Sequence, residues 1–182
     1  MIKLKILLFA SLIFGCANQN DQQKILNTAI EYISSENVPF RKMHYHNDSI
    51  LVDNQEKIIL IHPEMNEFHF ESVSSQLEKL RGNDNYSIEK QSILHPKKTT
   101  RNGVEIRPYH IPDDKRMNDI LFEQQAHAVV SFAPFIYNDA HSEAILFVNY
   151  ACGGLCGGIY QYTLMKNGLE WEIFDVESIT IY

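Results

Sequence analysis

The stretch AILFVNYACGGLCGGIYQYTLMKNGLEWEIFDV, residues 144–176, determines the fold that the sequence predicts. This stretch and the apolar run before it contain four apolar, β-rich segments: residues 128–137, 144–152, 156–165 and 169–176. Turn residues separate these segments, and the last separator, Asn167-Gly168, is the strongest signal for a two-residue hairpin loop. The pattern therefore predicts an antiparallel meander of three to four strands at the C-terminus.

The glycine-rich loop predicts the register of the central hairpin. If Gly153-Gly154-Leu155 is a three-residue loop, Cys152 faces Cys156 and the strands pair onward from there. The pairs that follow are Tyr150 with Gly158, Val148 with Tyr160, Leu146 with Tyr162, and Ala144 with Leu164. In this register one face of the hairpin collects almost only apolar side chains, so we expect that face to form the core.

The same face continues into the last strand. Across the Asn167-Gly168 turn, we expect Leu164 to lie beside Trp171. The next pair in this register is Tyr162 with Ile173. Trp171 is the only tryptophan of the chain, and its place in the pattern puts it on the core face.

The register also bears on Cys152 and Cys156. Residues four apart in one extended strand are about 13 Å apart, whereas cross-strand neighbours have α-carbons about 5.5 Å apart, within disulfide range. We predict a structural disulfide between the two cysteines that holds the hairpin tip. The alternatives are reduced, packed thiols and a redox-active or metal-binding pair. The spacing is not the Cys-x-x-Cys of thioredoxin-like proteins, and no helix start follows to lower a thiol pKa.

The first residues, MIKLKILLFASLIFGC, have the pattern of an export signal. Lys3 and Lys5 form a positive start, and residues 6–14 supply an apolar stretch that is too short to span a bilayer. The run from Leu12 to Cys16 resembles the lipobox of bacterial lipoproteins. The resemblance implies that Cys16 is lipidated on its thiol, acylated on its amine, and becomes the first mature residue. An ordinary signal peptide cut nearby and an uncleaved anchor are the alternatives.

We divide the chain into a signal peptide (residues 1–15), a lipidated tether (residues 16–23) and a single domain (residues 24–182). The chain has 16 Lys and Arg against 23 Asp and Glu residues, a formal net charge of −7. Such a charge repels nucleic acid, so we expect no nucleic-acid partner. The basic stretch 95–101 lacks interleaved aromatic residues and precedes the turn signal Asn102-Gly103, which is typical of a solvated loop.

Two stretches of the N-terminal half show helical spacing. The first predicts a helix from residue 21 or 22 to residue 35, capped by Asp21, with this apolar stripe: Ile25, Leu26, Ala29, Ile30 and Ile33. The second predicts a helix that ends before Gly82, with this stripe: Phe70, Val73, Leu77 and Leu80. Residues 50–52 and 57–62 flank a polar turn and predict a hairpin.

The remaining segments carry weaker signals. Residues 83–116 are polar, with weak strand signals at 87–94 and 104–107. Pro134 cannot donate a hydrogen bond to a ladder, so we expect residues 128–137 to lie at an edge or a bulge. Together the elements predict an α+β fold in which two helices pack on a mainly antiparallel sheet.

No stretch of the sequence has a specific catalytic signature, and catalytic residues are not assigned. A metal site is not expected, because the chain lacks a His-Glu-x-x-His motif. Of its eight histidines, those considered as ligands are His44 and His46, which are two residues apart, with His62 and His69. A thiol nucleophile would pair Cys156 with His127 or His141, but the sequence supplies no oxyanion hole. We predict no cofactor, because the glycines around Cys156 lie between strands with no helix start to bind a phosphate.

Three C-terminal motifs, Ser131-Phe132, Cys152-Gly-Gly-Leu-Cys156-Gly and Trp171-x-Ile173, are similar to the end of a family of uncharacterised bacterial secreted lipoproteins. The resemblance covers the C-terminal end and the leader and implies no activity. We expect a lipoprotein of the bacterial cell envelope, anchored by its lipid to a membrane, with the outer membrane favoured and the domain outside the cytoplasm. The favoured function is a non-enzymatic binding module for an envelope protein or small ligand. The alternative is an envelope hydrolase or thiol-dependent enzyme that uses Cys156 or histidines.

Overall fold

The computed structural model describes residues 21–35, 44–45, 49–50, 57–63, 78, 86–88, 96, 98–112, 114–152 and 157–181. The helices described are the N-terminal helix, residues 21–33, and α3, Met117–Glu123. The strands are β1 (His44–Tyr45), β2 (Ser49–Ile50), β3 (Lys57–Ile61), β4 (Tyr86–Ile88), β5 (Thr99–Arg101), β6 (Val104–Pro108), β7 (Ala128–Phe132), β8 (Ile136–Asn138), β9 (Glu143–Ala151), β10 (Gly157–Asn167) and β11 (Glu170–Ile181). In this part of the chain, neither helix has the length and hydropathy that a membrane span requires.

Nine of the strands form one mixed sheet with the order β11-β10-β9-β7-β3-β6-β5, to which β8 and β4 are added beside β9. β3 is parallel to both β6 and β7, and the other pairs of this sheet are antiparallel. β1 and β2 pair separately. The expected α+β class and the C-terminal meander are therefore confirmed. The second predicted helix lies outside the described residues except for Glu78, which is helical.

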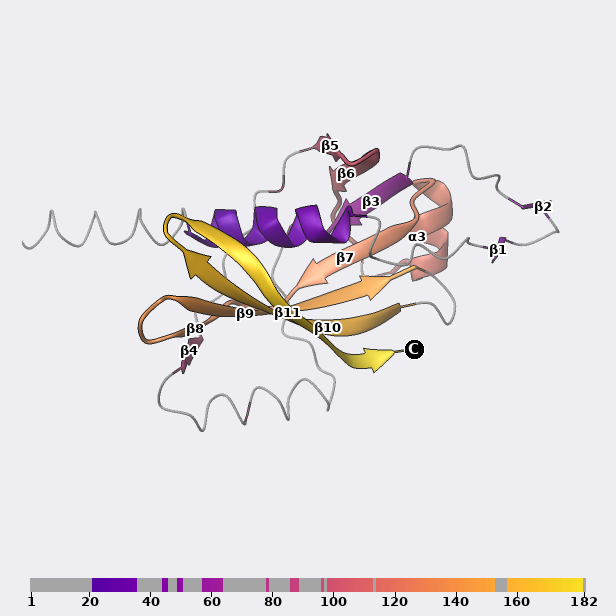
Figure 1. Ribbon diagram of the computed structural model, residues 1–182. Helices are drawn as coiled ribbons and strands as arrows, with labels where there is room; N and C mark the ends of the chain where they lie inside the picture. The colour runs from indigo at the N-terminus through magenta and orange to yellow at the C-terminus, as the bar shows by residue number, and fades with distance from the viewer. Residues whose placement is uncertain are drawn as a thin grey trace, which may run out of the picture.

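The two faces of the sheet bury different clusters. The N-terminal helix lies along one face (Figure 1), where its predicted stripe is buried against alternate residues of β3, β7, β9 and β10. On the opposite face, α3 buries Ile120 and Leu121 against Ile58 and Leu60 of β3. Because successive residues of a strand point to opposite faces, β3 is covered on both sides. Asp21 does not act as the predicted cap, since it already lies within the helix.

The predicted register of β9 against β10 is confirmed. All four predicted pairs are present, from Tyr150 with Gly158 to Ala144 with Leu164. The odd-numbered neighbours on β9, such as Phe147, are buried in a separate cluster on the other face. Successive residues of β9 therefore point to opposite faces of the sheet, and each face has its own buried cluster.

The predicted register of β10 against β11 is wrong by two residues near the turn, and by three residues beyond an irregularity between Ile173 and Asp175. The observed pairs are Lys166 with Trp171, Leu164 with Ile173, and Tyr162 with Val176. A shift by an even number of residues keeps every side chain on the same face of the sheet. Trp171 is therefore on the core face as predicted, with 3% of its surface exposed.

The position of the turn explains this error. Gly168 and Leu169 are the two central residues of the loop, whereas the sequence predicted Asn167 and Gly168. Gly168 has φ +63°, whereas the φ of Leu169 is not positive. A glycine with positive φ at the first central position is typical of a type II′ turn, whereas Asn-Gly at the centre gives type I′. A type I′ arrangement occurs instead at Asn102-Gly103, where both residues have positive φ.

The predicted hairpin of residues 50–52 with 57–62 is wrong. β2 pairs with β1, and β3 lies between β6 and β7 in the sheet. Both edges of β3 are thus occupied by parallel neighbours. The apolar run Ile58–Ile61 is buried on both faces, a burial pattern that marks an interior parallel strand.

The segment 128–137 also differs from its prediction. Pro134 separates β7 from β8, as a residue without an N–H group does, but β7 is an interior strand between β3 and β9. α3, which connects β6 to the parallel strand β7, was not predicted. Its N-cap residue is Arg116, and no side chain caps the helix, so the sequence carries no start signal there.

Candidate functional site

Cys152 lies directly after β9 with 4% of its surface exposed, and Cys156 lies outside the described residues. The last described pair of the β9–β10 ladder is Ala151 with Gly157. One further step in the same register would pair Cys152 with Cys156, which is the pairing that a cross-strand disulfide needs. The register thus supports the disulfide, which stays a prediction.

We expect a nonreduced digest of the exported protein to contain one internally bridged peptide with Cys152 and Cys156. The bridge leaves no thiol at this hairpin to react with iodoacetamide unless a reductant is added. Mass spectrometry before and after reduction measures both properties. A thiol that reacts quickly at neutral pH in the unreduced protein contradicts the disulfide and favours a thiol enzyme.

His127, one of the two bases considered for a thiol nucleophile, lies at the start of β7, on the strand next to β9. Its Nδ1 accepts a hydrogen bond from the Ile58 N–H group at 3.1 Å. Burial, with a smaller effect of Lys57, lowers the pKa of His127, so the ring is neutral at neutral pH. In a neutral ring whose Nδ1 accepts, the proton is on Nε2. Neither ring nitrogen then offers a lone pair to a thiol.

His141, the other base considered, lies in the turn between β8 and β9. Its ring stacks on Tyr137 with 5.0 Å between the ring centres. β9 runs from this turn to Cys152, and its nine residues span about 27 Å. His141 is therefore at the opposite end of the strand from Cys152, and Cys156, the thiol of the predicted pair, lies outside the described residues.

The other histidines do not form a metal centre in the part of the chain that the structure describes. His62 is buried after β3, and its ring meets the ring edge of His110 at 5.5 Å. His44 is in β1, whereas His46 and His69 lie outside the described residues. No group of three His, Cys, Asp or Glu side chains within the described residues is placed to hold a metal ion.

The described cations of the basic stretch 95–101 form ion pairs within the domain. Lys98 lies 2.7 Å from Glu105, and Arg101 lies 3.5 Å from Glu31. Arg107 binds the Glu105 carboxylate with two hydrogen bonds, of 2.8 and 2.7 Å. Hydrogen bonds from Arg107 and then Lys98 lower the pKa of Glu105 to about 2. These charges are therefore used in the fold and are not displayed as a basic patch.

The last strand of the sheet, β11, forms an exposed acidic edge. β11 has twelve residues, and no described strand pairs with it on the side away from β10. It carries four exposed carboxylates and no Lys or Arg: Glu170, Glu172, Asp175 and Glu177. Glu170 lies 3.4 Å from Lys24, and Glu172 accepts a hydrogen bond from Asn167. In the described part of the chain, no cation pairs with Asp175 or Glu177.

At alternate residues of β11, the backbone N–H and C=O groups point away from β10. The Lys166 N–H group donates to Ser142 O on the β9 side, so the backbone groups of Trp171, opposite Lys166, face away from β10. The Thr28 hydroxyl of the N-terminal helix donates to Trp171 O at 3.1 Å, as this orientation requires. Tyr162 lies an even number of residues from Lys166 along β10, so its backbone groups also face β9. The N–H and C=O groups of its partner Val176 therefore point away from β10. Val176 therefore presents both groups at the free edge.

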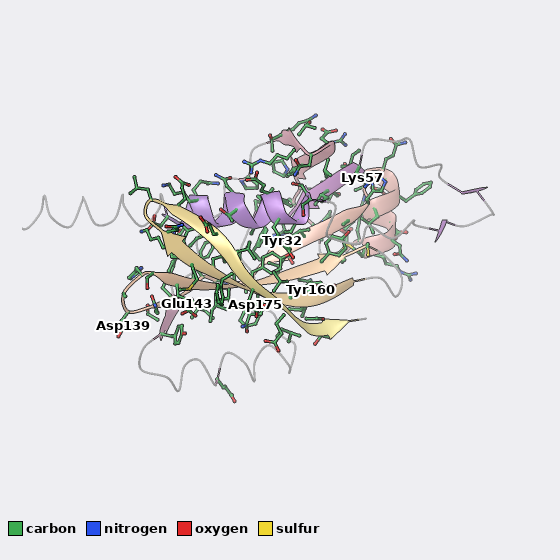
Figure 2. All side chains as sticks on the ribbon, viewed as in Figure 1. Tyr32, Lys57, Asp139, Glu143, Tyr160 and Asp175 are labelled. Carbon is green, nitrogen blue, oxygen red and sulfur yellow. The ribbon has the colours of Figure 1, made fainter. Side chains whose placement is uncertain are left out.

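Phe174 lies in the middle of this edge, with 74% of its surface exposed. The ladder passes from Ile173 to Asp175 without a partner for Phe174, so this residue is the extra one of a β-bulge. Figure 2 shows Asp175 near the middle of the domain and Asp139 far from it, at one end of the sheet. The bulge thus places a large apolar side chain next to Asp175, a carboxylate that no described cation pairs with.

A shallow groove of about 300 Å³ borders the same edge. It lies between the N-terminal helix, the β5–β6 turn and β11, and is lined by Thr28, Glu31, Tyr32, Ser35, Asn102 and Ile173. The Tyr32 ring meets the edge of the Tyr162 ring at 5.5 Å. Burial raises the pKa of Tyr162 and of Tyr150, so their hydroxyls stay protonated at neutral pH. The groove offers hydroxyl and carboxylate groups for binding.

A comparison with protein families, curated proteins and solved structures finds no match. The function of this chain therefore has to be inferred from its own geometry. The sequence predicted the last strand of the meander but not that no described strand pairs with its outer side. The signal was present in the spacing of Glu170, Glu172, Asp175 and Glu177, because charged residues are typical of strand edges.

Proposed function

We propose that this chain is a lipid-anchored protein of the bacterial cell envelope whose domain binds another protein, without catalysis, by accepting an extended strand along β11. The observation that supports this most directly is the free, acidic β11 edge with outward backbone groups at Val176. Addition of a strand to a sheet edge is a common way to recognise extended peptides.

The leader supports the anchored part of the proposal. A positive start, a short apolar stretch and the Gly15-Cys16 ending are together typical of a lipoprotein signal. We propose that lipid on Cys16 holds the domain at a membrane outside the cytoplasm, with the outer membrane favoured. The Cys152–Cys156 disulfide belongs to the same proposal, because disulfides persist in an oxidising compartment.

The negative charge of β11 favours a positively charged partner. Like charges placed opposite each other on neighbouring strands destabilise the pair. A second copy of β11 would bring carboxylates against Asp175 and Glu177, so the edge disfavours self-association. An extended segment rich in Lys or Arg instead neutralises these two carboxylates. Phe174 and the neighbouring groove add contacts for its side chains.

The experiment uses a defined probe, an eight-residue peptide of alternating lysine and valine. We expect it to shift the NMR amide signals of β11, and we expect Asp175→Lys with Glu177→Lys to weaken its binding about tenfold through lost attraction and added repulsion. The matched control is Asp114→Lys with Asp139→Lys, which makes the same change of charge at exposed sites away from β11. The control is expected to bind like the parent.

A backbone variant separates strand addition from charge attraction alone. Val176→Pro removes an N–H group that faces the free edge, and proline is tolerated on edge strands. We expect this variant to lose binding while it keeps Asp175 and Glu177. If it binds the peptide like the parent, or if the peptide shifts signals away from β11, strand addition at this edge is wrong.

A further inference from the structure

The start of the N-terminal helix lies against the tip of the β10–β11 hairpin. The Lys166 ammonium contacts the Asp21 carboxylate at 2.6 Å. One turn further along the helix, Lys24 donates to the backbone carbonyl of Leu169 and lies 3.4 Å from Glu170. Two ion pairs and a backbone contact thus hold the hairpin tip beside the point where the helix begins.

The length of the tether limits how far this end of the domain lies from the lipid. Five peptide units separate Cys16 from Asp21, and a fully extended chain spans at most about 3.6 Å per residue, or about 18 Å here. This step rests on the proposed lipid anchor at Cys16. With the acyl chains in the bilayer, the tether keeps Asp21 within about 18 Å of Cys16, and the hairpin tip lies beside Asp21.

The hairpin tip carries an apolar side chain where turns usually have polar ones. Leu169 is the second central residue of the turn, and 78% of its surface is exposed. Two of the charge pairs beside the tip are compensated, because Lys166 pairs with Asp21 and Lys24 with Glu170, while the Glu172 carboxylate accepts a hydrogen bond from Asn167. The tip therefore presents an exposed leucine next to two neutralised pairs, although the whole chain has a net charge of −7.

We propose that the β10–β11 tip is a membrane-contact surface, in which Leu169 enters the headgroup region of the bilayer that holds Cys16. The contact orients the domain. β10 runs away from the membrane, and its eleven residues put Gly157 and the neighbouring Cys152 about 33 Å further out. The free edge of β11 also runs outward from the tip, which leaves Val176 accessible to a partner.

The test uses the lipidated protein in phosphatidylcholine vesicles whose acyl chains carry bromine, a short-range quencher of tryptophan fluorescence. Leu169→Trp places a reporter at the tip, and Phe174→Trp places the matched control at an exposed site further along the same strand. Trp171 is buried and gives the same background in both variants. We expect quenching above that background to be at least about twofold greater at position 169, because interfacial contacts reach about 5–10 Å into the boundary of headgroups and acyl chains.

Flotation of the same vesicles separates this inference from the anchor on which it rests. Protein that does not float with the vesicles overturns the lipid anchor and the orientation together. Protein that floats but shows equal quenching at positions 169 and 174 overturns the membrane contact of Leu169 alone. Strong quenching at position 169 that persists in high salt supports an apolar contact over an electrostatic one.

Discussion

Replacing Trp171 by alanine is expected to lower the free energy of unfolding by about 3–5 kcal/mol, as deletion of a large aromatic side chain from a packed core does. The side chain is 3% exposed and packs at the edge of the Tyr137 ring, with 6.1 Å between ring centres. The Lys166 ammonium lies 5.5 Å from the centre of the indole. Urea denaturation followed by circular dichroism measures the change, since the variant lacks its tryptophan fluorophore.

The stabilisation by Trp171 comes from packing. Its Nε1 is buried and has no hydrogen-bond partner in the described part of the chain. The matched control is Phe174→Ala, which removes an aromatic ring of the same strand that is 74% exposed. This control is expected to change stability by less than about 0.5 kcal/mol. A Trp171→Ala variant as stable as the control would show that the indole is not part of the core in solution.

The register of β9 against β10 is predictable because two independent signals agree. A three-residue glycine-rich loop predicts Cys152 opposite Cys156, and the pairs that follow from it put Tyr150, Leu146 and Leu164 on one face, as observed. A slip of one residue would expose this apolar set, so the hydrophobic pattern specifies the register strongly. The β10–β11 register lacks such a check, because a slip of two residues leaves every face unchanged. There the choice of turn residues decides, and Asn167-Gly168 and Gly168-Leu169 both satisfy the pattern.

The position of β3 depends on contacts that the local sequence does not contain. Its run Ile58–Ile61 has no polar alternation, which is the pattern of a strand covered on both faces. The strands that pair with its two edges, β6 and β7, come more than forty residues later in the chain. The sequence next to β3 offers only β2, and a local reading therefore pairs the wrong strands.

The candidate site could not be predicted from the sequence for a similar reason. Glu170, Glu172, Asp175 and Glu177 are visible in the sequence, but only the strand order shows that their strand is an edge. The same holds for the hairpin tip. Leu169 looks like part of an apolar run, and the register makes it a turn residue beside the start of a helix that lies far away in the sequence.

Replacing Cys16 by alanine is expected to abolish labelling with palmitate and to remove the protein from the membrane fraction. The physical reason is the size of the anchor. Each buried methylene group contributes about 0.8 kcal/mol, and stable anchoring takes more than one acyl chain, which lipidation of both the thiol and the amine supplies. Metabolic labelling and sedimentation of the parent and the Cys16→Ala variant measure the two effects.

The matched control is a variant with Cys152→Ala and Cys156→Ala, which removes the other two cysteines and keeps Cys16. It is expected to be labelled and to sediment like the parent, with modestly reduced stability. The single side chain of Leu169 buries far too little apolar area to hold the domain at a membrane without the lipid. Release of the Cys16→Ala variant is therefore expected even if the hairpin tip contacts the bilayer. A Cys16→Ala variant that is still labelled and still sediments with membranes would show that the lipoprotein assignment is wrong.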